Sequence, residues 1–74
     1  MVKTQNVDTE LLDNAINRSG LKIGFIVEQL GISRQAFDQK RKGNTCFRKS
    51  EVYVLKSLLN LTDEETIKIF FPES

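Results

Sequence analysis

The sequence predicts an all-α fold in which five short helices form one compact domain. Apolar residues recur at spacings of three and four along five stretches of the chain, as the buried face of an amphipathic helix requires. Turn and capping residues separate these stretches. The chain has 74 residues, 39% of them hydrophobic, which suffices for one small core. We therefore interpret residues 1–74 as a single domain, with residues 1–6 expected to be flexible.

The first two helices are predicted by apolar stripes that end at glycines. The stripe of the first helix consists of Val7, Leu11, Leu12, Ala15 and Ile16. Asp8 or Thr9 can cap this helix, and Ser19 with Gly20 ends it. The stripe of the second helix consists of Ile23, Ile26, Val27 and Leu30. Gly31 ends it after about two turns of 3.6 residues.

A third helix is predicted to begin directly after this glycine. Ser33 can cap it, and its one large apolar residue is Phe37. Gly43, Asn44 and Thr45 then predict a turn or loop.

The stretch at residues 50–61 has a mixed signal. Val52, Tyr53 and Val54 favour a strand by propensity. However, Val52, Leu55 and Leu59 are spaced as on one face of a helix, and Leu58 extends that face. The length of the stretch also suits a helix, so we predict a helix.

The last helix has the strongest start signal. Thr62 and Glu65 have the spacing of a capping box, in which each side chain accepts a hydrogen bond from the backbone of the other residue. Ile67, Phe70 and Phe71 predict an apolar face, and a proline ends the helix.

Composition argues against several classes of function. The sequence has no His, the usual general base near neutral pH, and Cys46 alone cannot form an internal disulfide or a zinc site. We therefore expect no enzymatic activity, no metal and no cofactor. No apolar run approaches the roughly 18 residues that a membrane span needs, and the N-terminus is too polar for a signal peptide. These features predict a cytoplasmic protein with no membrane partner.

The most informative segment runs from Leu21 to Gly43 and reads LKIGFIVEQLGISRQAFDQKRKG. Its two short helices are separated only by residues 31–33. Gly31 suits this tight turn because it readily takes a backbone conformation that other residues resist. Ile26 and Phe37 are expected to face a shared core.

Burial of these positions would leave one face of the third helix exposed. The outward side chains are then Arg34, Gln35, Asp38, Gln39 and Arg41. Arg can pair with guanine and Gln with adenine through two hydrogen bonds each, and a carboxylate such as Asp38 can accept one from cytosine. Arg34 and Gln35 lie in the first turn, and Gln39 lies one turn further along the same face. A recognition helix enters the major groove in this arrangement.

The residues LGISRQAF, followed by RKG, resemble the helix-turn-helix of the Cro/repressor (Xre-like) family of bacteriophage and bacterial transcriptional regulators. The resemblance covers roughly residues 8–72, and the ending IKIFFP is similar to that of small phage-type members. It implies the lambda-repressor-like DNA-binding fold. It also implies a sequence-specific regulator, a repressor of phage or prophage type, that reads operator DNA in the major groove through its third helix.

The same resemblance implies specific DNA contacts. Base contacts fall at Arg34, Gln35 and Gln39. Asp38 is added to this set because it lies on the same outward face of the third helix. Phosphate contacts fall at Lys22, Ser33, Arg41, Lys42, Asn44 and Arg48. Three residues depart from the family pattern. Val27 stands where Ala is usual, Ile23 replaces a frequent Gln, and Arg41 occupies a position that is usually apolar.

The charge distribution supports a nucleic-acid partner, although the net charge of +1 does not. Between Arg34 and Lys49, six basic residues stand against Asp38 alone, so the local net charge is +5. From Asn60 to Ser74 the local net charge is −3. Phosphate binding depends on cations gathered on one face, so the distribution is more informative than the sum.

The sequence is compatible with two kinds of protein partner. A homodimer could form through the C-terminal helix, with Phe70 or Phe71 at the contact and the other of the two in the core. Such a dimer is expected to be weak or completed on DNA. The alternative function is a protein-interaction module of helix-turn-helix fold, such as an antirepressor or an antitoxin-like partner, that binds through its C-terminal apolar face. Asp38 keeps this alternative open, because phosphates repel a carboxylate.

Overall fold

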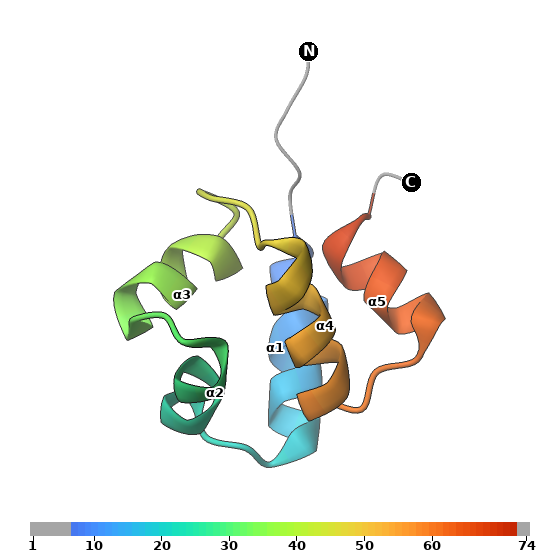
Figure 1. Cartoon of the computed structure of the whole chain (residues 1–74). Coiled ribbons are helices and arrows are strands. Elements are labelled where there is room, and N and C mark those ends of the chain that lie inside the picture. Colours follow the sequence, from blue (N-terminus) through green and yellow to red (C-terminus); the bar gives the residue numbers. More distant parts are fainter. Residues whose placement is uncertain (1–6, 73–74) are drawn as a thin grey trace.

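Five α-helices form the part of the protein that the structure, a computed structural model, describes, namely residues 7–72 (Figure 1). They are α1 (Thr9–Ser19), α2 (Ile23–Leu30), α3 (Arg34–Arg41), α4 (Lys49–Leu58) and α5 (Asp63–Phe70). No strand occurs in this range, so the prediction of an all-α domain is confirmed. The expectation of a flexible segment at residues 1–6 lies outside the described residues.

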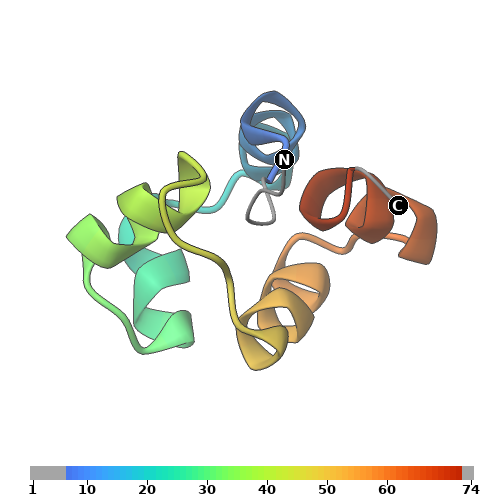
Figure 2. The same cartoon turned by 90° about the horizontal axis from the view of Figure 1, so that it is seen from above.

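The helices are arranged with α1 and α4 in the middle of the molecule. In two perpendicular views, α2 and α3 lie together on one side of this pair and α5 lies on the other (Figures 1 and 2). The segment with the local charge of +5 is therefore separated from the acidic C-terminal helix. The helix α3, which carries three of the six cations of the basic segment, thus lies on the other side of the central pair from α5 (Figures 1 and 2).

Side chains cap α1 and α3 as the sequence predicts. The Asp8 carboxylate accepts the backbone N–H of Leu11 at 3.1 Å. The Ser33 hydroxyl accepts the backbone N–H of Ala36 at 3.0 Å. Each bond satisfies one of the amide groups that a helix start leaves without an intrahelical partner.

The capping box of α5 is also confirmed. The Thr62 hydroxyl accepts the Glu65 N–H, and the Glu65 carboxylate accepts the Thr62 N–H, both at 3.0 Å. This backbone hydrogen bond, aided by Arg18, holds the pKa of Glu65 below its ordinary value. A hydrogen bond and ion pair from Lys56 at 2.7 Å likewise lower the pKa of Asp63. Both charged carboxylates thus stabilise the start of α5 at neutral pH, and this contribution is lost as acid protonates them.

The core lies where the five helices meet. Its buried apolar residues are Leu12, Ala15, Ile16, Ile26, Phe37, Val52, Leu55, Leu59, Leu61, Ile69 and Phe70. The ambiguous stretch at residues 50–61 is helical up to Leu58, and its predicted stripe supplies three of these side chains. Burial against other helices thus outweighs the strand propensity of this stretch.

The predicted apolar face of α5 is wrong in part. Ile67 is 50% exposed and Phe71 is 42% exposed, whereas Ile69 is buried. Phe70 is buried as well, so Phe70 is the one of the two phenylalanines that lies in the core and Phe71 is the exposed one, as the prediction allowed. The inward face includes Thr66, whose hydroxyl donates to the Thr62 carbonyl and is thereby satisfied. This internal hydrogen bond allows a threonine to occupy a buried position that the apolar pattern did not assign to it.

Candidate nucleic-acid interface

The connection between α2 and α3 is a three-residue turn. Gly31 has a φ of 74°, in the left-handed region that favours glycine, and its N–H donates to the Val27 carbonyl at 2.9 Å. The Ile32 side chain is half-buried and packs against the core. Ile26 and Phe37 are both buried, so the predicted shared core of these two helices is confirmed.

The exposed side of α3 presents most of the residues proposed to contact bases. Arg34, Gln35 and Gln39 are exposed, and the Asp38 side chain is 38% exposed. The Gln39 amide oxygen accepts a hydrogen bond from the Asn44 side chain at 2.8 Å. This contact joins the end of the helix to the loop that follows it.

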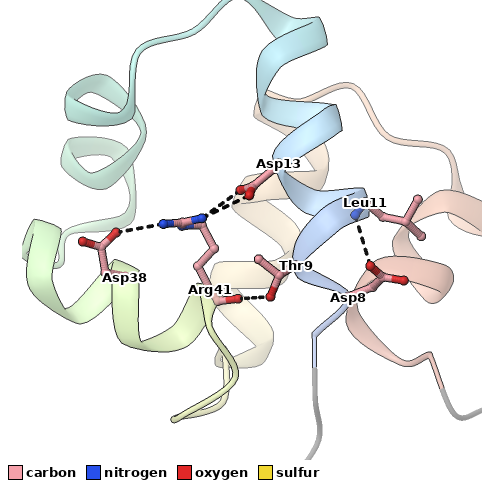
Figure 3. A network of polar contacts seen from close by, with 6 residues as sticks. All are labelled: Asp8, Thr9, Leu11, Asp13, Asp38 and Arg41. Atoms are coloured by element: carbon pink, nitrogen blue, oxygen red, sulfur yellow. Dashed lines mark hydrogen bonds and ion pairs between the residues drawn. The ribbon is translucent and has the colours of Figure 1, made fainter.

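Arg41 does not extend outward from α3 as predicted. Its guanidinium Nη1 donates to both Asp13 carboxylate oxygens, at 3.0 and 3.2 Å, and its Nη2 lies 3.6 Å from Asp38 (Figure 3). Its backbone carbonyl accepts the Thr9 hydroxyl at 2.6 Å. The side chain is only 25% exposed, so Arg41 joins α3 to α1 and leaves the set of candidate phosphate contacts. The Asp13 carboxylate opposite Arg41 supplies the counter-charge that allows this arginine to be partly buried.

Lys40 is also engaged inside the domain. Its ammonium lies 3.3 Å from the Glu51 carboxylate and donates to the Cys46 carbonyl at 3.0 Å. The Lys40 and Glu51 side chains are 13% and 9% exposed. Consecutive residues at the end of α3 therefore connect it to α4 and to α1.

These contacts change the charge map. Two of the six basic residues counted between Arg34 and Lys49 are neutralised within the domain, so the local charge of +5 overstates what a ligand would meet. In residues 7–72, the exposed cations without a carboxylate at ion-pair distance are Lys22, Arg34, Lys42, Arg48 and Lys49. Three of them belong to the predicted phosphate-contacting set. Lys49 is equally exposed and unpaired, but the sequence-based set of candidate phosphate contacts did not include it.

The other predicted phosphate contacts are exposed. Ser33 and Asn44 both reach solvent, but the Ser33 hydroxyl already caps α3. Lys22 precedes α2, which has no side-chain cap, so no side chain satisfies the amide groups at its start. Amide groups of this kind favour an anion.

A cavity of about 700 Å³ opens beside α3. Its lining comes from the end of α1, the start of α2 and one side of α3. Lys22, Arg34 and Arg41 contribute positive charge to it, and Asp13 and Asp38 contribute negative charge. The cavity therefore adjoins both the start of α2 and the exposed side of the third helix.

Within the described part of the chain, no three His, Cys, Asp or Glu side chains are grouped as a metal site would require. The helices of this part are too short and too polar to cross a membrane. Comparisons of the chain with models of protein families, with curated protein sequences and with solved structures give no match. The region around α3, with its exposed polar side chains and unpaired cations, is therefore the candidate functional site.

Proposed function

We propose that the protein is a sequence-specific DNA-binding transcriptional regulator, a repressor of phage or prophage type. The distribution of its cations is the observation that carries the proposal. Among residues 7–72, every exposed cation without an ion-pair partner lies between the start of α2 and the first residue of α4. The cations elsewhere in this range are paired with carboxylates. A charge distribution of this kind directs one face of a nearly neutral protein toward a polyanion.

In this proposal, α3 enters the major groove with its N-terminal end first. Arg34 and Gln35 are exposed in the first turn, and Gln39 follows Gln35 one turn later. These side chains suit guanine and adenine edges, which accept and donate hydrogen bonds in pairs. The helix is short, so its first two turns supply the base contacts.

The surrounding cations would contact the DNA backbone. Lys22 lies at the uncapped start of α2, Lys42 follows α3, and Arg48 and Lys49 lie at the start of α4. Each phosphate contact releases condensed counterions, so affinity should fall steeply with salt. Asn44 adds an uncharged donor in the loop between α3 and α4.

We also propose a homodimer contact, at an exposed apolar patch made by α1 and α5. Leu11, Ile67 and Phe71 form this patch and are 39%, 50% and 42% exposed. Asp8 and Lys68 line the shallow cavity of about 280 Å³ beside it. A two-fold contact requires a self-complementary surface, and a margin with both signs of charge meets that requirement. Three apolar side chains make a small interface, which suits a dimer that DNA completes.

The same patch is the observation that favours the second candidate function. A protein-interaction module would use Leu11, Ile67 and Phe71 to bind its partner and would leave α3 unoccupied. Selection of binding sites from random DNA with the purified protein, at two salt concentrations, separates these functions. Enrichment of an inverted repeat with half-sites about 34 Å apart supports the dimeric regulator. Enrichment of no sequence supports the interaction module.

Two substitutions test how the face around α3 would contact DNA. We expect Arg34→Ala to cost about 1–3 kcal/mol of binding free energy and to relax the preference at particular base pairs. Lys42→Ala should instead weaken binding to all sequences and reduce the slope of log affinity against log salt by about one. Lys68→Ala on α5 removes the same charge on the opposite side of the fold and is the matched control, measured on a single half-site, where the proposed dimer contact plays no part. An equal loss from Lys42→Ala and Lys68→Ala would contradict the proposed face.

The dimer contact has a separate test. We expect Phe71→Asp to lower the affinity for an operator with two half-sites by at least about tenfold, because two carboxylates would meet across the two-fold axis. Affinity for a single half-site should stay the same. Ser57→Asp introduces the same charge at an exposed position on α4 that lies outside the patch and away from Lys49. If Phe71→Asp and the unaltered protein bind the operator with two half-sites equally tightly, the dimer contact lies elsewhere.

A further inference from the structure

Asp38 is an unusual residue for a surface that approaches phosphates. It lies one helical turn after Arg34 and one before Lys42, on the exposed side of α3. Neither of these side chains is at ion-pair distance from it in the described structure. Its compensating charge comes from Arg41, whose Nη2 lies 3.6 Å from the Asp38 carboxylate.

Arg41 offsets the charge of Asp38 without forming a hydrogen bond to its carboxylate. The guanidinium hydrogen bonds go to the two Asp13 oxygens, at 3.0 and 3.2 Å, whereas the contact with Asp38 is an ion pair only (Figure 3). Among residues 7–72, no donor forms a hydrogen bond with the Asp38 side chain. Its oxygens therefore remain able to accept a hydrogen bond from a ligand.

We infer that Asp38 selects cytosine at one position of the DNA site, and that Arg41 and Asp13 are positioning residues that make this possible. The inference rests on the proposed DNA-binding function and specifies what one residue of that face recognises. An ionised carboxylate only accepts hydrogen bonds. In the major groove guanine presents two acceptors and thymine one, and in adenine an acceptor adjoins the amino group. Cytosine presents an amino donor, so it is the base that suits Asp38.

The contact of Arg41 with Asp13 has two consequences in this arrangement. It fixes a positive charge beside Asp38, which offsets the repulsion between this carboxylate and nearby phosphates. It also engages Nη1 with Asp13 and leaves Nη2 3.6 Å from Asp38, beyond hydrogen-bond distance. Without Asp13, Arg41 would be free to form hydrogen bonds with Asp38 and to compete with the base.

The test measures the affinity of purified variants for an operator in which each base pair is replaced in turn by the other three. For Asp38→Asn, we expect discrimination in favour of cytosine to fall roughly 5- to 150-fold at one position and to stay unchanged elsewhere. Affinity for the best remaining sequence should not fall, because the substitution removes a negative charge near phosphates. A purely structural role for Asp38 would instead lower affinity for every sequence alike.

Asp13→Asn tests the positioning role. Discrimination at the same base pair should fall although Asp38 is unchanged. Glu10→Gln removes one negative charge from the same helix, at an exposed residue with no ion pair in the described structure, and should leave discrimination intact.

If Asp13→Asn does not fold, Asp38→Asn decides the inference. Unchanged base preference in Asp38→Asn, with DNA binding retained, overturns the inference alone. Absence of sequence-selective binding by the unaltered protein overturns it together with the proposed function.

Discussion

Replacement of Phe37 by alanine is expected to lower the free energy of unfolding by about 3–5 kcal/mol. Phe37 is fully buried and is the one buried side chain of α3. Its ring meets Phe47 edge-on at 6.1 Å, and Phe47 meets Phe70 of α5 in the same way at 5.4 Å. The substitution would therefore leave a cavity at one end of a row of three aromatic rings and would remove the main apolar attachment of α3.

Chemical unfolding followed by far-ultraviolet circular dichroism checks this expectation. A domain of 74 residues has a total stability of about 4–11 kcal/mol, so Phe37→Ala could leave much of the protein unfolded at 25 °C. Phe37→Leu keeps part of the volume and should give a smaller loss with a measurable native baseline. Ile67→Ala, at a residue that is half exposed, should change stability by about 0.5 kcal/mol or less. A similar small change from Phe37→Ala would show that another contact attaches α3.

Local signals in the sequence predicted the helices well because each depends on neighbouring residues. The side chains of Asp8, Ser33 and Thr62 cap the helices that they were expected to start. The glycine at residue 31 takes the left-handed conformation that its turn requires. Such contacts span three or four residues and need no knowledge of the tertiary structure.

The orientation of α5 could not be predicted in the same way. This helix has apolar residues at 67, 69, 70 and 71, so more than one stripe with helical spacing fits its short sequence. Packing against α1 selects the face that includes Ile69, whose carbonyl accepts the Asp8 N–H at 2.7 Å. The same selection leaves Ile67 and Phe71 exposed.

The ion pairs of α3 could not be predicted from the sequence, for a related reason. Arg41 and Asp13 are 28 residues apart, and only the tertiary fold brings them together. Counting charges along the chain therefore treated Lys40 and Arg41 as available to a ligand. The helical position of Arg41, next to the buried face that contains Phe37, was a weak signal that it points inward.

The pair formed by Lys40 and Glu51 leads to the second large expected effect. We expect Lys40→Met to lower the free energy of unfolding by about 3 kcal/mol, because it leaves the Glu51 carboxylate nearly buried without its counter-ion. Glu51→Gln should also destabilise the protein, since the Lys40 ammonium would then lack a negative partner. The double variant should be more stable than either single variant. Its glutamine oxygen can still accept the Arg48 N–H that Glu51 accepts at 2.8 Å. Chemical unfolding of all four proteins measures the coupling between the two side chains.

The double variant also separates stability from DNA contact. Lys40 lies in the basic run of α3, so a loss of DNA affinity in Lys40→Met alone could come from unfolding or from a lost phosphate contact. If Lys40 acts only by holding α3 against α4, the Lys40→Met/Glu51→Gln variant should recover both stability and the salt dependence of binding. If Lys40 itself binds phosphate, the salt slope of the double variant should stay lower by about one although its stability recovers. The geometry favours the first outcome, because the Lys40 ammonium is directed to Glu51 and to the Cys46 carbonyl, and the side chain is only 13% exposed.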